Sequence, residues 1–443
     1  MPDRKKIVVL GSTGSIGEHT LRVVAEQPDR LEITALAARS NAERLVAQAK
    51  ACHVKRVCLL DRAAAKRARE LDGSLEVLEG SEGMCELAAT SNADTVMMAL
   101  VGLAGLAPTL AALSAGHDVA LATKEVLVGA GELVMQTAAR SGRWLLPVDS
   151  EHSAVFQCLQ DINRHRMDAN GHEFFINKNN YSRSFASFDD ENYLSKITLT
   201  ASGGPFFNKP ETDFETVSIA ETINHPKWKM GQKISVDSAT MMNKGLELIE
   251  ARWLFNVPPE RLDVVVHPES IVHALVEFAD GATLAQLSPP DMRVAIQYAL
   301  SWPERWPATR ERLDLAALRA LTFFAPDETR FPCLALARAA MNAGGLASTV
   351  LNAANEVAVE GFLAGKISLA TVPRIIEKAM EEFRRAGTAR PTLEAVLEID
   401  AETRAKTNEN LSLPSFVSLA SIESSQSRQA RQSKPNFNQG VNP

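Results

Sequence analysis

A glycine-rich turn near the N-terminus constrains the fold of this chain more than any other sequence feature. The segment Gly11-Ser-Thr-Gly14-Ser-Ile-Gly17 directly follows a short apolar run at 7–10 and opens an amphipathic segment at 17–26. Glycine lets backbone N–H groups approach a pyrophosphate at a helix N-terminus, where a Cβ would block the approach. Such a turn alone is weak evidence, but its position after a first strand predicts dinucleotide binding.

Short apolar runs alternate with helical patterns up to about residue 150. The runs predicted as strands are 7–10, 32–36, 56–60, 75–78, 95–100, 119–122 and 144–148. This alternation is typical of a doubly wound parallel sheet with helices on both faces. We therefore predict an α/β fold with a Rossmann-like nucleotide-binding domain over residues 1–149.

The end of the second predicted strand indicates which dinucleotide is bound. An NAD site usually has Asp or Glu there to bind the ribose 2′-hydroxyl. This chain instead continues with Arg39, Ser40 and Asn41. A guanidinium can pair with a 2′-phosphate, and the two polar side chains can donate to it, which favours NADPH. The alternative is a solvated loop arginine.

Length, charge and cysteine content limit the remaining possibilities. A chain of 443 residues predicts two or three domains, and a formal net charge of −7 argues against nucleic acid as a partner. No apolar stretch approaches the roughly 20 residues that cross a membrane, and the run at 7–10 is too short for a signal peptide. The five cysteines are scattered without metal-ligand or disulfide spacing. This pattern is typical of a reducing cytosol, so we predict a cytoplasmic protein.

Beyond residue 150 the chain divides into four further parts. Residues 150–301 are predicted as a second α/β domain, with strands at 197–200, 262–266, 271–278 and 283–286 and a helix at about 239–255. The polar stretch 161–196 is predicted as a surface insertion with a hairpin around 173–176. A linker over 302–330 leads to a helical domain at 331–410, with helices at 335–341, 347–364, 372–385 and 393–407. The Ser-, Gln- and Asn-rich segment 411–443 is predicted to be a disordered tail.

Two acidic clusters predict a metal site. Asp149 and Glu151 stand two residues apart at the predicted end of a strand, where their side chains would point to the same side. Carboxylates that converge need a proton or a cation between them, and oxygen ligands alone suit Mg²⁺ or Mn²⁺. The alternative from this pair alone is a solvated acidic strand end.

The second cluster lies on the predicted helix at 239–255. Asn243, Lys244, Glu247 and Glu250 fall on one stripe of that helix. Lys244 and Asn243 could hold a phosphate or hydroxyl while a glutamate completes a metal triad. The spacing does not distinguish Glu247 from Glu250, and an i,i+3 salt bridge between Lys244 and Glu247 is the plain alternative.

Two loops extend this candidate site. Ser202-Gly203-Gly204-Pro205 follows a strand and offers a hydroxyl and open backbone N–H groups to a phosphate. His225-Pro-Lys-Trp228-Lys-Met230-Gly231 combines an aromatic ring, a thioether and two lysines with a terminal glycine, which is typical of a lid that excludes water. The alternative for the second loop is a buried surface turn.

These segments together resemble the 1-deoxy-D-xylulose 5-phosphate reductoisomerase family over residues 5–405. The segments that carry the resemblance are 11–17, 121–125, 147–153, 200–206, 225–250, 267–273, 284–293 and 351–356. The resemblance implies an NADPH-binding domain, a central catalytic domain and a C-terminal helical domain in a homodimer.

The resemblance also implies roles for individual residues. The metal ligands would be Asp149, Glu151 and Glu247, with Lys124 as a further catalytic residue. The residues that bind the substrate would be Ser150, Ser202, His225, Trp228, Ser238, Asn243 and Lys244, with Met230 also in the lid. The residues that line the cofactor would be Thr13, Gly14, Ser15, Ile16, Arg39, Ser40, Asn41, Thr123, Glu125 and Gly231.

The implied reaction is a retro-aldol/aldol rearrangement of 1-deoxy-D-xylulose 5-phosphate, followed by reduction with NADPH to 2-C-methyl-D-erythritol 4-phosphate. It is the committed step of the non-mevalonate isoprenoid pathway. The chain departs from the family pattern at Thr123, where Asn is usual, and at Val126, where Ser or Thr is common. The shorter Thr123 hydroxyl is expected to weaken one contact with the cofactor.

Two other functions are weighed against this one. An NADPH-dependent dehydrogenase without an isomerase step would turn over without a divalent cation. An NADPH-sensing protein that signals through its helical domain would need neither a metal triad nor a phosphate site. The set of Asp149, Glu151 and Glu247 argues against the dehydrogenase. The presence of Asp149, Glu151, Lys124 and Lys244 argues against the sensor.

Overall fold

The computed structural model describes residues 4–163 except 91, residues 193–413 except 229 and 309, and residue 416. Most of the predicted insertion at 161–196, including its hairpin, and most of the predicted tail at 411–443 lie outside these residues. No helix in the part of the chain that is described is long and apolar enough to span a membrane.

The N-terminal part is a seven-stranded, all-parallel sheet with the order β4-β3-β2-β1-β5-β6-β7. Its strands are β1 (Lys5–Leu10), β2 (Leu31–Ala38), β3 (Arg56–Leu59), β4 (Glu76–Glu79), β5 (Thr95–Met98), β6 (Asp118–Leu121) and β7 (Leu145–Pro147). Its helices are α1 (Ser15–Glu26), α2 (Ala42–Ala51), α3 (Arg62–Leu71), α4 (Gly80–Ala88), η1 (Gly102–Gly105), α5 (Leu106–Ser114) and α6 (Glu125–Ser141). The predicted doubly wound sheet is confirmed.

The strand order places the glycine-rich turn at the point where the sheet topology reverses. The four consecutive residues 7–10 of β1 are fully buried, as expected for a strand covered on both faces. β1 lies between β2 and β5, and ligands of open α/β sheets bind at the carboxyl ends of such strands. The turn after β1 therefore occupies the expected nucleotide position.

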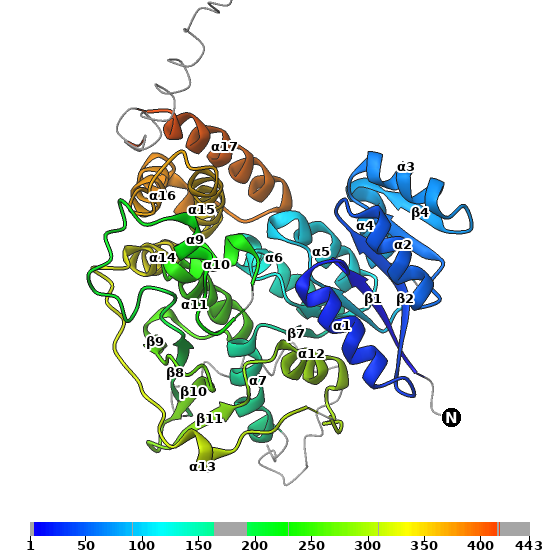
Figure 1. Cartoon of the computed structure of the whole chain (residues 1–443), viewed down its shortest axis with the longest axis horizontal. Helices are drawn as coiled ribbons and strands as arrows, with labels where there is room; N and C mark the ends of the chain where they lie inside the picture. Colours follow the sequence, from blue (N-terminus) through cyan, green and yellow to red (C-terminus); the bar gives the residue numbers. More distant parts are fainter. Residues whose placement is uncertain are drawn as a thin grey trace, which may run out of the picture.

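A second, four-stranded mixed sheet follows, with the order β11-β10-β8-β9. β8 and β9 are parallel, whereas β10 is antiparallel to both β8 and β11. The elements of this part are α7 (Ser150–Asn163), β8 (Leu194–Ala201), α9 (Ile219–Ile223), α10 (Gln232–Ala239), α11 (Met242–Phe255), η3 (Pro259–Arg261), β9 (Leu262–Val266), β10 (Val272–Phe278), β11 (Thr283–Leu287), α12 (Met292–Ser301) and α13 (Leu315–Leu318). α7 packs on β10 and β11, and α12 packs on α1, so this part contacts the first sheet (Figure 1).

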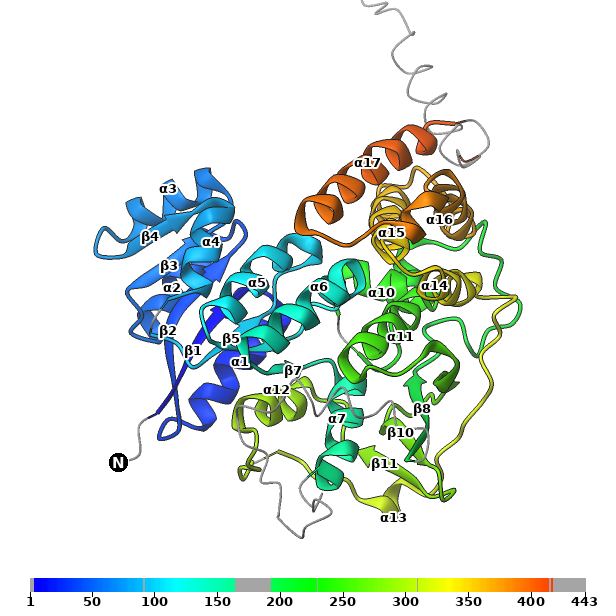
Figure 2. The ribbon, with the colours of Figure 1, turned by 180° about the vertical axis from the view of Figure 1, so that it is seen from behind.

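The C-terminal part is helical, as predicted. It contains α14 (Pro332–Ala343), α15 (Ala347–Leu363), α16 (Thr371–Glu382), η4 (Arg384–Thr388) and α17 (Leu393–Leu411). α15 contacts α6 of the N-terminal part, α10 of the central part, and α16 and α17 of its own part. Figure 2 shows this group from behind, with α10 and α11 drawn between the sheets and the C-terminal helices.

The single helix predicted at 239–255 is wrong at its start. α10 ends at Ala239, and α11 begins at Met242 after Met241, which has a left-handed φ of 60°. The Thr240 hydroxyl donates to carbonyls of the preceding turn and accepts from the Met242 N–H. A side chain that bonds to the local backbone competes with helix continuation, which explains the break.

Replacing Gly11 with alanine is expected to destabilise the N-terminal sheet by at least about 3 kcal/mol. Gly11 has a φ of +92°, and a Cβ there would lie 2.2 Å from the carbonyl oxygen of Ala99. Gly142 is the matched control, since it also has a positive φ of 62° but no atom lies within 4 Å of its Cβ position. Its alanine variant should cost only about 1 kcal/mol. Equal losses of Tm in the two variants would contradict this account.

Candidate active site

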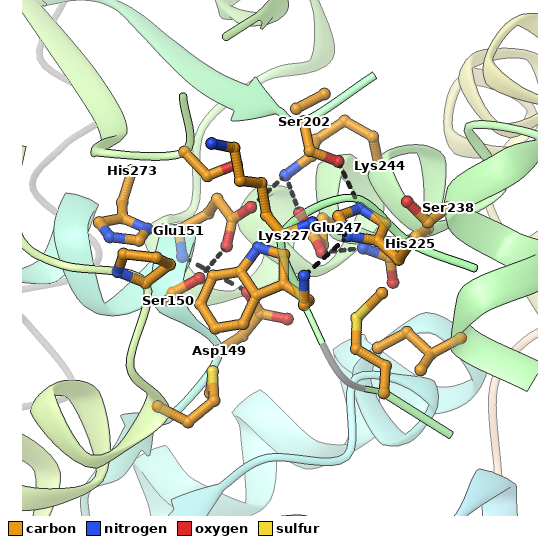
Figure 3. A pocket seen from close by; sticks show the side chains of 18 of the residues that line it. Asp149, Ser150, Glu151, Ser202, His225, Lys227, Ser238, Lys244, Glu247 and His273 are labelled. Carbon is orange, nitrogen blue, oxygen red and sulfur yellow. Dashed lines mark hydrogen bonds and ion pairs between the residues drawn. The ribbon is translucent and has the colours of Figure 1, made fainter. Parts of the chain in front are cut away.

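A cavity of about 490 Å³ lies where the two sheets meet, between the start of α1, the ends of β6, β7 and β8, the segment before α10, and α11. Figure 3 shows that acidic, basic and hydroxyl side chains from these elements point into it. Lys124, Ser150, Ser202, His225, Trp228, Ser238, Asn243 and Lys244 all line this cavity with the three predicted metal ligands. The structure thus brings the sequence-predicted catalytic and substrate residues together.

The three predicted metal ligands converge from two elements. One ligand oxygen from each of Asp149, Glu151 and Glu247 lies within 4.8 Å of the others. Asp149 follows β7, but Glu151 lies in the first turn of α7, so the predicted strand geometry of this pair is wrong. The carboxylates converge because a helix begins immediately at Ser150, and its first turn faces α11.

Two buried lysines form ion pairs with this acidic cluster and offset part of its negative charge. The Lys124 Nζ lies 2.6 Å from Asp149 Oδ2 and 2.6 Å from Glu247 Oε1. The Lys244 Nζ lies 2.7 Å from Glu151 Oε1 and also contacts Glu247. The Lys244–Glu247 salt bridge considered from the sequence therefore forms, and the same carboxylate still belongs to the triad. Asn243 accepts a hydrogen bond from Lys124 at 3.0 Å.

The electrostatics of the cluster favour a bound cation. Burial and the neighbouring Glu247 carboxylate raise the pKa of Glu151 to about 7, although Lys244 opposes the shift. Burial alone would raise the pKa of Asp149, but Lys124 and His152 outweigh it and hold that pKa well below its usual range. Three carboxylates and two ammoniums leave one unbalanced negative charge when all are ionised. This oxygen-only donor set with excess negative charge fits a hard divalent ion.

The geometry distinguishes Glu247 from Glu250, which the sequence spacing left open. Glu250 instead approaches His152, and its Oε2 lies 3.5 Å from Nδ1 of that ring. The same His152 nitrogen lies 3.5 Å from Asp149 Oδ1, and its Nε2 lies 2.9 Å from the Glu247 carbonyl oxygen. His152 and Glu250 are fully buried and do not line the cavity. They support the ligands from behind, whereas Glu247 faces the cavity.

A second group of side chains fits a phosphate. Ser202 follows β8, and its Oγ accepts from the Gly204 N–H at 3.2 Å. Ser238 at the end of α10 and Asn243 at the start of α11 line the same cavity. The two glycines after Ser202 have φ values of 81° and 70°, which turn the chain tightly below the cavity. Hydroxyl, amide and backbone donors of this kind bind phosphate oxygens.

The predicted lid residues form a turn over the cavity. His225 Nδ1 accepts from the backbone N–H groups of Lys227 and Trp228 at 3.1 and 2.9 Å. Its Nε2 therefore carries the proton and donates to Ser202 Oγ at 2.8 Å. Trp228 and Met230 line the cavity, and Gly231 caps α10 with open space at its Cβ position.

The His225 imidazole is expected to stay neutral down to about pH 5. Burial lowers the pKa of His225 to about 4, so the folded protein binds this proton less readily than the unfolded chain, whose histidine has a pKa of about 6.5. The resulting contribution to lid stability is fully present above about pH 6.5 and is lost as the pH falls toward 4. A ¹³C-labelled histidine NMR titration, assigned with His225→Gln, measures this pKa. A midpoint near 6.5 would contradict the expected neutral form.

Apart from Gly231, which caps α10, the predicted cofactor residues lie at the ends of β1, β2 and β6. Thr13 and Gly14 form the turn, and Ser15 and Ile16 begin α1 and line the cavity. No side chain caps the N-terminus of α1, so its first N–H groups are open to an anion. Arg39, Ser40 and Asn41 are exposed after β2, and the Asn41 side chain accepts from the Arg44 N–H.

Two residues predicted to contact the cofactor, Thr123 and Glu125, have side chains that are bonded to other parts of the protein. The Thr123 hydroxyl is buried and donates to the Leu100 carbonyl oxygen, so it is directed into the protein. The Glu125 carboxylate is 11% exposed, and its Oε1 lies 2.7 Å from Lys233 Nζ. Neither assignment is tested by the geometry, and both stay predictions.

Comparison with known proteins identifies the family. Residues 7–131 match the model described as 1-deoxy-D-xylulose 5-phosphate reductoisomerase, residues 145–255 match the C-terminal domain model of that description, and residues 287–406 match DXP reductoisomerase C-terminal domain. The chain belongs to the 1-deoxy-D-xylulose 5-phosphate reductoisomerase family. The resemblance identified in the sequence is thereby confirmed.

Curated relatives and solved structures agree with this reductoisomerase family. The relative from Methylococcus capsulatus is 47% identical over 405 residues, covering 90% of this chain and 97% of its own. The relative from Chloroherpeton thalassium is 46% identical over 402 residues, covering 90% and 96%. A crystal structure of DOX-P reductoisomerase in complex with NADPH, fosmidomycin and magnesium is 40% identical, covers 92% of this chain and 98% of its own, and has a TM-score of 0.83. The Zymomonas mobilis reductoisomerase in complex with NADPH is 40% identical, covers 93% and 100%, and has a TM-score of 0.80.

Some residues of this reductoisomerase site were not predicted from the sequence. His273 on β10 lines the cavity, and burial lowers its pKa to about 4. Asp291 and Met292 line it from the start of α12. These residues lie in the segments 267–273 and 284–293, which carry part of the family resemblance. That resemblance is the only sequence feature from which they could have been predicted.

Proposed function

We propose that this chain catalyses the NADPH- and divalent-metal-dependent conversion of 1-deoxy-D-xylulose 5-phosphate to 2-C-methyl-D-erythritol 4-phosphate. The observation that carries the proposal is a single cavity that holds the Asp149–Glu151–Glu247 triad, two lysines and a hydroxyl-lined phosphate pocket beside the nucleotide turn. A simple dehydrogenase needs no triad, and an NADPH sensor needs no phosphate pocket.

The metal and the substrate phosphate would be held by adjoining groups of side chains, since Lys244 contacts both Glu151 and Glu247. Mg²⁺ or Mn²⁺ bound by Asp149, Glu151 and Glu247 would supply Lewis-acid polarisation of the substrate's carbonyl and neighbouring hydroxyl oxygens. Ser150 and Lys124 lie beside the triad and would bind and orient these oxygens. The phosphate would be held by Ser202, Ser238, Asn243 and Lys244, which supplies binding energy remote from the reacting carbons.

The lid and the nucleotide turn complete the proposed machinery. His225, Trp228 and Met230 would cover the substrate and exclude water while its carbon–carbon bond breaks and re-forms. The turn at 11–17 would hold the NADPH pyrophosphate, and Arg39 with Ser40 and Asn41 would bind the 2′-phosphate. Thr123, Glu125 and Gly231 would line the remaining part of the cofactor. NADPH bound by these residues would supply the hydride that reduces the rearranged aldehyde.

The proposal extends to domains, assembly and location. Residues 1–149 would bind NADPH, 150–301 would carry the catalytic site, 302–330 would connect, and 331–410 would form the helical domain. We propose a cytoplasmic homodimer, whose association would bury apolar surface such as Phe323 and Phe324, which are 44% and 47% exposed. Light scattering after size exclusion should give twice the mass of one chain, and the mass of a single chain would contradict the dimer.

The test of function is NADPH oxidation at 340 nm with 1-deoxy-D-xylulose 5-phosphate and Mg²⁺ or Mn²⁺. The expected result is metal-dependent loss of absorbance that EDTA abolishes, with 2-C-methyl-D-erythritol 4-phosphate as the product by mass spectrometry and NMR. Oxidation that survives EDTA would favour a dehydrogenase. NADPH binding without any turnover would favour a sensor.

A further inference from the structure

A buried polar cluster outside the cavity joins the three parts of the molecule. Lys233 on α10 places its Nζ 2.7 Å from Glu125 Oε1 at the start of α6 and 2.9 Å from Asp237 Oδ2 on α10 itself. Asn355 on α15 donates to the other Asp237 oxygen at 2.9 Å. Asn355 is fully buried, and the side chains of Asp237, Glu125 and Lys233 are only 1%, 11% and 24% exposed. Lys233 is therefore the most solvent-exposed of these four residues, and the other three are largely buried.

The position of this cluster connects it with the proposed active site. α6 begins immediately after Lys124, whose ammonium contacts Asp149 and Glu247. α10 begins immediately after Gly231, at the end of the lid segment, and carries Ser238 near its other end. A contact between α6 and α10 therefore fixes the catalytic lysine relative to both the lid and a phosphate-binding hydroxyl.

α10 depends on such contacts for its position. It has only eight residues, and no side chain caps its N-terminus. Helices shorter than about 12 residues are marginal in water without tertiary packing. The fully buried apolar side chains of α10 are only Val236 and Ala239. α10 also packs on α9, α11 and α15. Two polar contacts add to this packing and link α10 to α6 through Lys233 and to α15 through Asp237.

The charges of the cluster favour an ionised Lys233. Burial alone would lower the pKa of its ammonium, but Asp237 and Glu125 outweigh burial and raise that pKa well above the usual value. One ammonium shared by two carboxylates cannot be replaced by a neutral side chain without leaving a buried charge unpaired. Lys233 is thus a partly buried lysine whose ion pair with Glu125 connects α10 to α6.

We infer that Lys233 is a positioning residue for the proposed reaction: its ion pair with Glu125 holds α10, and with it the lid and Ser238, in register with Lys124. The inference rests on the proposed function, because it assigns Lys233 a part in closing that same site. Lys233 touches neither the triad nor the cavity, so its effect passes through the position of α10.

The test uses full-length Lys233→Met, which keeps the aliphatic stem, and Glu125→Gln, which keeps the shape of its partner. Each is expected to raise the KM for 1-deoxy-D-xylulose 5-phosphate about tenfold or more. Lys233→Met alters no cofactor-lining residue, so it should change the KM for NADPH by less than about threefold. Lys233→Arg should recover most of the loss, since it restores the charge. The double variant should be no worse than the more affected single variant, because both remove one interaction.

Hydrogen exchange by mass spectrometry supplies a second readout that needs no turnover. Lys233→Met should exchange faster over residues 232–239 and at the lid, with β1 and α15 unchanged. The matched control is Lys378→Met on α16, which removes an i,i+4 ion pair with Glu382 far from the cavity. Its KM values and exchange should equal those of the wild type.

The outcomes separate this inference from the proposed function. Unchanged KM and unchanged exchange in both Lys233→Met and Glu125→Gln would overturn it, as would faster exchange spread evenly over the chain. If the wild type shows no metal-dependent turnover, the proposed function fails. Hydrogen exchange at residues 232–239 then decides alone whether the Lys233–Glu125 ion pair holds α10 in place. If Lys233→Met does not fold, Glu125→Gln decides by the same two measurements.

Discussion

Replacing Glu247 with glutamine is expected to lower kcat/KM by on the order of a thousandfold or more and to weaken Mn²⁺ binding by at least about tenfold. Glu247 is 1% exposed and is the ligand candidate that both lysines contact. Glutamine keeps an oxygen at nearly the same place but removes the charge, so two carboxylates then face two ammoniums. The excess negative charge that attracts a divalent ion is lost.

The matched control for Glu247→Gln is Glu250→Gln, one turn further along α11. Glu250 is equally buried, but it faces His152 and not the cavity. Partners behind metal ligands typically contribute about 10- to 100-fold, so its loss should be clearly smaller. Mn²⁺ binding measured by electron paramagnetic resonance, alongside NADPH oxidation, compares the two variants. Abolished metal binding in Glu250→Gln with near-normal binding in Glu247→Gln would assign the site to the Asp149–His152–Glu250 group instead.

Local sequence patterns predicted the first sheet because its determinants are local. Strand β1 ends in a run of four apolar residues followed at once by Gly11, and both features follow from burial on two faces and a tight turn. The metal triad was predicted with the right residues but partly the wrong geometry. Two acids at i and i+2 look alike in a strand and at a strand-to-helix junction, and the helix start at Ser150 lies within the usual error of a predicted boundary.

Contacts between distant segments could not be predicted from the pattern. The choice between Glu247 and Glu250 depends on where β7 and His152 lie relative to α11. The pairing of Glu125 with Lys233 joins residues 108 positions apart. Each of these residues read singly is an ordinary helix-surface charge, and only the packing of α6, α10 and α15 shows that they are buried together.

Replacing Lys124 with methionine is expected to lower kcat by on the order of a thousandfold while leaving Mn²⁺ affinity unchanged or tighter. Lys124 is 5% exposed, and its ammonium lies between Asp149 and Glu247. Burial alone would lower its pKa, but Asp149 and Glu247 outweigh burial and raise that pKa well above the usual value, so the lysine is charged at neutral pH. A fixed charge inside a closed cavity stabilises the negative charge that develops on substrate oxygens as the bond breaks.

Lys124→Met should affect catalysis and metal binding differently. Without Lys124 the three carboxylates of the triad keep only the Lys244 ammonium beside them. In the metal-free protein the carboxylates therefore repel one another more strongly, and a divalent ion no longer competes with the Lys124 ammonium for them. We therefore expect a lower Tm without metal and a larger rise of Tm on adding Mg²⁺ than in the wild type. Glu247→Gln should show the reverse, a smaller rise of Tm, because it removes a ligand.

Lys244→Met is the matched control for Lys124→Met, because both lysines are buried and pair with Glu247. Lys244 is assigned to the substrate phosphate, so its loss should mainly raise the KM for the sugar phosphate. Steady-state kinetics at saturating NADPH and Mg²⁺, with thermal unfolding at several Mg²⁺ concentrations, distinguishes the two lysines. If Lys124→Met raises KM with kcat unchanged, or binds Mn²⁺ more weakly than the wild type, Lys124 serves to hold substrate or ligands and does not stabilise the reacting oxygens.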